Sequence, residues 1–142
     1  MTVKELIVKV RKENKIVQHK QEELARLEAL CGVSGISYDA KEGTSGSRNV
    51  NKNEQSYLRY IEFKDDLKEY IAAALSSRKK LMALIDKLES HQAIDIMYKY
   101  CMENQTLRQI GEEKSYTKQA IHKIYTRSIE EMDKELTKVD PN

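Results

Sequence analysis

The chain has 142 residues, of which 34% are charged and 6% aromatic, and its net charge is +2. Five glycines and a single proline are too few for the turns of a sheet protein, so the composition predicts long helices with charged outer faces. No apolar run has the length of a signal peptide or a membrane span, and Cys31 and Cys101 form no ligand pair, so we expect a protein of the reducing cytoplasm that makes no membrane contact.

Residues 2 to about 30 are predicted to form the first long helix. Thr2 can cap its start, and Glu5 follows three residues later, which is the pattern of a capping box. Apolar residues then recur at a 3-4 spacing: Val3, Ile7, Val10, Val17 and Leu24. Asn14 and Gln21 interrupt this stripe, so the spacing predicts a coiled-coil-like seam with two polar breaks.

The segment 32–53 differs in composition from the rest of the chain. It contains four of the five glycines and several Ser and Asn residues. Such a segment buries too little apolar surface to offset the entropy of ordering, so we expect a flexible linker.

A second long helix is predicted from about Glu54 to Leu88. Its 3-4 repeat is Tyr57, Tyr60, Lys64, Leu67, Ile71, Ala74, Arg78, Leu81, Ile85 and Leu88. A repeat of more than four heptads predicts a helix that packs against another helix. The partner is either the first helix, folded back as a hairpin, or the same helix of a second subunit in a homo-oligomer.

Three shorter helices are predicted in the last third of the chain. Each follows a hydroxyl residue that can cap it: Ser90 before 91–102, Thr106 before 107–114, and Thr117 before 118–139. The expected domains are therefore residues 1–89, with the two long helices and the linker, and residues 90–139. The expected fold class is all-α.

The last two predicted helices have the arrangement of a helix-turn-helix. Leu107 and Ile110 face a small core with the buried side of the final helix, and Gly111 stands where the two helices would cross closely. The opposite face carries only hydrogen-bonding, non-acidic residues: Lys118, Gln119, His122, Lys123, Thr126 and Arg127. Such a helix fits the major groove of DNA, so 118–127 is the predicted recognition segment.

The distribution of charge supports this interpretation. Residues 106–127 carry five bases and two acids, whereas 128–142 carry two bases and five acids. The small net charge thus conceals a basic face beside an acidic tail. Thr117 and Arg108 complete the predicted DNA-binding set, and Tyr116 and Tyr125 are further candidates for stacking on bases.

The segment from Ala93 onward resembles region 4 of sigma-70-type factors. The framework positions that match are Thr106, Leu107, Ile110, Gly111, Thr117, Ile121, Ile124 and Ile129. Ser115 stands at a turn position where this framework commonly has Gly. The whole layout resembles phage-encoded regulators of late transcription of the ArpU/RinA kind. This resemblance implies a helix-turn-helix that binds DNA, with N-terminal helices that set the oligomeric state or contact RNA polymerase.

The sequence offers no basis for catalysis. It has no Gly-rich phosphate loop and no acid–base pair, and no ligand stands three or four residues from His122, so neither an enzyme, a cofactor nor a metal is expected. The leading hypothesis is a sequence-specific regulator of transcription, phage- or prophage-encoded, that binds double-stranded DNA at promoters in the host bacterial cytoplasm. The alternatives are a small-terminase-like DNA-recognition subunit of a phage packaging complex and a protein-interaction adaptor.

Overall fold

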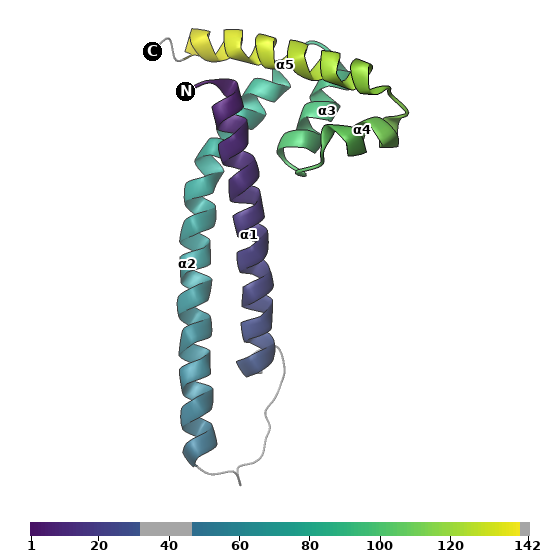
Figure 1. The fold of residues 1–142 in the computed structure, drawn as a ribbon. Helices are drawn as coiled ribbons and strands as arrows, with labels where there is room; N and C mark the ends of the chain where they lie inside the picture. The colour runs from purple at the N-terminus through teal and green to yellow at the C-terminus, as the bar shows by residue number, and fades with distance from the viewer. Residues whose placement is uncertain (32–46, 140–142) are drawn as a thin grey trace. The chain divides into compact units, whose positions relative to one another are not determined.

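The computed structural model describes residues 1–31 and 47–139, with the backbone alone at 47–53 and 139. The regular secondary structure of this part of the chain is α-helix alone (Figure 1), which confirms the predicted all-α class. The helices are α1 (Val3–Cys31), α2 (Ser47–Asp86), α3 (His91–Cys101), α4 (Leu107–Lys114) and α5 (Lys118–Val139). Of the helices in the described ranges, none is both long and apolar enough to pass through a membrane.

The start of α2 differs from the prediction. The helix begins at Ser47 rather than near Glu54, so the last part of the expected linker is helical. No Gly or Pro stands between Ser47 and Asn53, and an existing helix gains one hydrogen bond for each residue added to its end. The remainder of the expected linker, 32–46, lies outside the described residues.

The chain packs as two compact units whose limits differ from the expected domains. One unit combines Met1–Lys15 with Ala73–Asn142, and the other is Ile16–Ala72. The expected boundary between residues 89 and 90 therefore does not separate two cores. The reason is that α3 and α5 share one core with apolar residues from both long helices.

The core of the first unit contains residues from α1, α3 and α5 and from the end of α2. Its buried members are Val3, Leu6, Ile7, Val10, Leu81, Leu84, Ile85, Leu88, Ala93, Met97, Cys101, Ile129, Met132 and Leu136. A smaller cluster joins Ile96, Ile110 and Ile121 of α3, α4 and α5. Burial raises the pKa of the Cys101 thiol to about 12, which fits a core residue rather than a reactive one.

The polar residue Asn14 is bound on both sides of its amide. Its Nδ2 donates to the carbonyl oxygen of Cys101 at 2.9 Å and to Asn104 Oδ1 at 3.0 Å. Its Oδ1 accepts from Arg78 Nη1 at 2.6 Å. The first predicted break in the α1 seam therefore links α1 to α2 and to the loop after α3.

In the second unit, α1 and α2 pack against each other within the chain. The hydroxyl of Tyr60 donates to Glu28 Oε1 at 3.0 Å, and Lys20 Nζ lies 5.6 Å from the ring centre of Tyr70. Tyr57 and Ile71 belong to the predicted repeat but are 49% and 37% exposed. A straight helix drifts away from a strict seven-residue repeat, so the contact covers only part of the predicted stripe.

Candidate nucleic-acid interface

The helices α4 and α5 begin at the predicted caps. Thr106 Oγ1 accepts from Gln109 N at 3.1 Å, and Gln109 Oε1 accepts from Thr106 N at 2.9 Å, which forms a complete capping box. Thr117 Oγ1 accepts from Ala120 N at 3.1 Å. These bonds satisfy amide groups that the first helical turn leaves unpaired, so both helix starts are set by local sequence.

Gly111 allows α4 and α5 to cross closely, as predicted. A Cβ atom at this position would lie 3.2 Å from Ile121 Cγ1 and 3.3 Å from the carbonyl oxygen of Tyr116. Both distances are tighter than most Cβ contacts, so a side chain here would require Ile121 or the turn at Tyr116 to shift by a few tenths of an ångström. The absence of a side chain therefore sets how α5 is held.

The turn between α4 and α5 comprises residues 115–117. Ser115 ends α4 in the left-handed region, with φ 61° and ψ 38°. The amide of Tyr116 donates to the Gly111 carbonyl oxygen at 2.9 Å and closes the helix end. A serine thus occupies a conformation that glycine adopts without steric cost.

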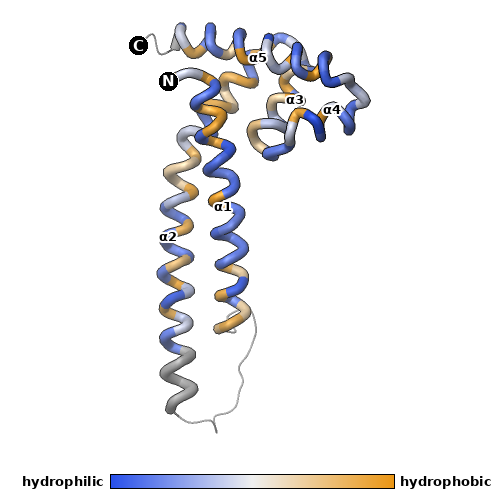
Figure 2. The backbone as a smooth tube through the Cα atoms, in the orientation of Figure 1, coloured by the Kyte–Doolittle hydropathy of each residue, from blue (hydrophilic) through white to orange (hydrophobic). Residues whose placement is uncertain are grey.

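One side of α5 is buried and the other is open. Ile121 and Ile129 are 2% and 5% exposed, whereas Ile124 is half-buried. The tube in Figure 2 accordingly alternates between hydrophobic and hydrophilic residues along α5. The eight predicted DNA-binding residues are all exposed: Arg108, Thr117, Lys118, Gln119, His122, Lys123, Thr126 and Arg127.

The α5 residues of this set spread over roughly half of the helix circumference at 100° per residue. Gln119 and Thr126 lie near the middle of that face, His122 and Lys123 lie on either side of them, and Lys118 and Arg127 lie at its two edges. A helix in the major groove brings its middle to the base edges and its borders to the phosphates. The arrangement therefore places polar groups centrally and charged groups on both sides.

Ion pairs divide the nearby basic residues into two groups. Lys114 pairs with Asp95, and Arg108 Nε lies 3.2 Å from Glu112 Oε1. By contrast, no ion pair within the described part of the chain involves Lys118, Lys123 or Arg127. Of the bases in 106–127, those without an ion pair among the described residues therefore all lie on α5.

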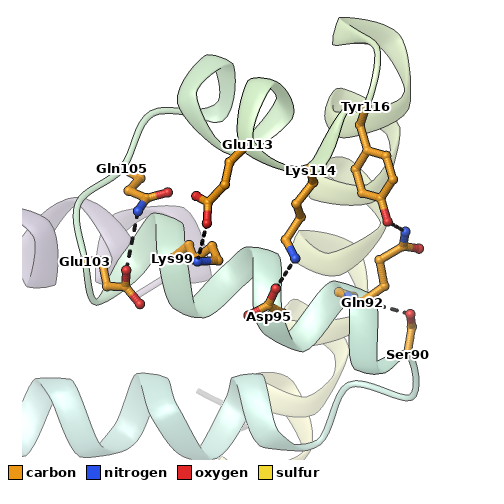
Figure 3. A network of polar contacts seen from close by, with 10 residues as sticks. Ser90, Gln92, Asp95, Lys99, Glu103, Gln105, Glu113, Lys114 and Tyr116 are labelled. Carbon is orange, nitrogen blue, oxygen red and sulfur yellow. Dashed lines mark hydrogen bonds and ion pairs between the residues drawn. The ribbon is translucent and has the colours of Figure 1, made fainter.

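The paired groups hold α3 against α4 and the turn (Figure 3). Lys99 Nζ lies 3.1 Å from Glu113 Oε1, and Gln92 bonds the hydroxyl of Tyr116. The ion pair between Lys114 and Asp95 joins the same two helices. Tyr116 is therefore engaged within the protein and half-buried, in contrast to the expectation of a free stacking ring.

Arg11 contributes to this region although no sequence pattern indicated it. Its guanidinium lies 4.1 Å from the ring centre of Tyr100, and its Nη2 donates to the carbonyl oxygen of Asn104 at 3.3 Å. Tyr100 in turn meets Tyr125 edge to face at 5.2 Å, and burial raises the Tyr125 pKa to about 12. Tyr125 is packed inside the unit, so it is not placed to stack on bases.

Within the described ranges, no three His, Cys, Asp or Glu residues gather in a group that could hold a metal ion. No family model matches the chain, and neither a curated protein nor a solved structure is similar enough to match it. The proposal below therefore rests on the geometry and charge of α4 and α5.

Proposed function

We propose that the chain is a sequence-specific regulator of transcription that binds double-stranded DNA. In this proposal α4 and α5 form a helix-turn-helix, and the exposed face of α5 enters the major groove. The observation that carries it is a set of three cations on α5: Lys118, Lys123 and Arg127. None of them has an ion-pair partner among the described residues, and the exposed polar face between 118 and 127 contains no acidic residue. A solvated helix face commonly mixes both charges, whereas a DNA-binding face is depleted of acids.

The proposed roles differ along this face. Gln119, His122 and Thr126 reach base edges and supply discrimination between sequences. Lys118, Lys123 and Arg127 bind phosphates and supply affinity for any DNA. Arg108 joins the phosphate contacts by exchanging Glu112 for a phosphate, since this pair is exposed and weak in water.

The test uses fluorescence anisotropy with fragments selected from host and phage genomes. Lys123→Ala should weaken binding to every sequence and lower the slope of log K against log salt by about 0.9, because one phosphate contact is lost. Gln119→Ala should instead reduce the preference for the selected site, with little change on unrelated DNA. Lys134→Ala is the matched control, because Lys134 is an exposed lysine of α5 that lies about two helical turns beyond Arg127, outside the segment 118–127.

Wild-type binding by both Lys123→Ala and Gln119→Ala would refute the assignment of α5. If the anisotropy of every DNA fragment stayed unchanged at low salt, this result would favour a protein-interaction adaptor. Light scattering addresses the packaging alternative, since a regulator forms a monomer or a small oligomer and a terminase-like subunit forms a stable ring. In a regulator, the long helices α1 and α2 would supply the contact with RNA polymerase or with a second copy of the chain.

A further inference from the structure

A partly enclosed cavity of about 480 Å³ lies between α4 and the start of α5. Its floor is apolar and consists of Leu107, Gly111, Tyr116 and Ile121. The two helices meet closely at this floor, since a Cβ on Gly111 would lie only 3.2 Å from Ile121 Cγ1. The volume lies within the roughly 300–1,000 Å³ that small-molecule sites occupy, and an apolar floor is their usual lining.

The mouth of the cavity carries charged and polar side chains. Arg108, Glu112, Lys118 and His122 line it, and all four are exposed. Arg108 and Glu112 neutralise each other, with Nε and Oε1 3.2 Å apart. Lys118 makes no ion pair within the described residues, so the mouth has one uncompensated positive charge.

We propose that this cavity binds a small organic anion whose apolar body lies on the floor and whose single negative group lies beside Lys118. A neutral apolar molecule would leave the lysine without a partner, and a dianion would meet the carboxylate of Glu112. The site therefore selects an amphipathic monoanion by size and charge together.

Such a ligand would also control the proposed DNA interface, and this part rests on the proposed function. Lys118 and His122 belong both to the cavity mouth and to the face of α5 that is assigned to DNA. The same side chains cannot serve a bound anion and a phosphate at once. The ligand and DNA therefore exclude each other, and ligand binding releases the protein from its site.

The first experiment measures binding to the full chain without DNA. The probe is 8-anilinonaphthalene-1-sulfonate, an amphipathic monoanion whose fluorescence rises in apolar surroundings, and its neutral analogue N-phenyl-1-naphthylamine lacks the sulfonate. We expect saturable binding of one sulfonate per chain and affinity for the neutral analogue that is weaker by about threefold or more, as for an exposed ion pair.

Two matched variants locate the site. Lys118→Gln should weaken the sulfonate by about threefold and leave the neutral analogue unchanged. Lys123→Gln should leave both dyes unchanged, because Lys123 is an exposed cation of α5 that does not line the cavity. Equal affinity for the two dyes, equal loss in both variants, or several sulfonates bound per chain would overturn the assignment.

The second experiment tests exclusion of DNA. With the sulfonate at ten times its dissociation constant, the apparent affinity for DNA should fall about tenfold by mass action. If the DNA affinity stayed unchanged, the proposal that the ligand excludes DNA would be wrong. The dye measurements alone would then decide whether the cavity binds the anion. A chain that binds the sulfonate as expected but binds no DNA would refute the proposed function alone.

Discussion

Ser115 and Asn104 both have a left-handed backbone, with φ of 61° and 56°. Their side chains differ in what they contribute. Asn104 Nδ2 donates to the carbonyl oxygen of Arg11 at 2.9 Å, and its Oδ1 accepts from Asn14. Ser115 is exposed, and the cap at this position is made by backbone atoms. The left-handed backbone at Asn104 is therefore offset by side-chain hydrogen bonds. Ser115 has the same strained backbone, and its side chain makes no hydrogen bond to the described residues.

The two positions should respond in opposite ways to glycine. Ser115→Gly should stabilise the fold by about 0.5 kcal/mol, because relief of the left-handed strain slightly exceeds the entropy that glycine adds to the unfolded chain. Asn104→Gly relieves the same strain but should destabilise the fold by roughly 1–2 kcal/mol, because its hydrogen bonds are lost. Urea unfolding of both variants measures this, and a shift of the same sign in both would contradict the explanation.

At the scale of elements, α1 is bound to the segment that leads into α4. Arg11 contacts Tyr100 and the Asn104 carbonyl oxygen, and Asn14 donates to the Cys101 carbonyl oxygen at 2.9 Å. The last turn of α3 and the loop after it thus lack the freedom of an ordinary surface connection. The position of α4, and with it the crossing at Gly111, depends on a helix that lies far away in the sequence.

Removal of the Arg11 side chain should therefore loosen this segment. Arg11→Ala should lower the free energy of unfolding by roughly 1–3 kcal/mol through loss of the hydrogen bond and the cation–π contact. Arg11→Lys should restore only part of this, because an ammonium group cannot stack as a planar guanidinium does. Lys12→Ala, at the neighbouring exposed position, is the control. If Arg11→Ala unfolds at the same urea concentration as Lys12→Ala, the contacts of Arg11 with Tyr100 and Asn104 do not contribute to stability.

At the scale of the whole molecule, the proposed recognition helix α5 shares one core with α3 and with the ends of both long helices. Val3 and Ile7 of α1 and Leu81 of α2 are each at most 2% exposed in this core. In addition, the amide of Val3 donates to Asp133 Oδ1 of α5 at 3.0 Å. A domain limited to 90–139 would expose the surface that these residues cover.

The fragment 90–139 should consequently fail to unfold cooperatively in far-UV circular dichroism, since its apolar surface has too few partners. A chain that joins 1–15 to 73–142 by a flexible Gly/Ser linker should unfold cooperatively, because it retains the complete first unit. A cooperative transition in the shorter fragment, or its absence in the longer one, would show that the core is divided differently.

The sequence alone determined the features that depend on neighbouring residues. The bounds of α4 and α5, the caps at Thr106 and Thr117, and the buried side of α5 follow from hydroxyl caps and from the spacing of Ile residues. The close crossing at Gly111 was predictable for the same reason, because helix spacing places this residue between α4 and α5. Helix caps and helical periodicity depend only on residues that lie close together in the chain.

Only the tertiary structure decided which distant residues meet. It showed that α2 packs against α1 of the same chain and that the core extends over the expected domain boundary. It also placed Arg11 on Tyr100 and packed the half-buried ring of Tyr125 edge to face against Tyr100. These contacts join residues that are far apart in the chain, and periodicity states only that a face is apolar. Which other helix covers that apolar face depends on how the helices pack in three dimensions.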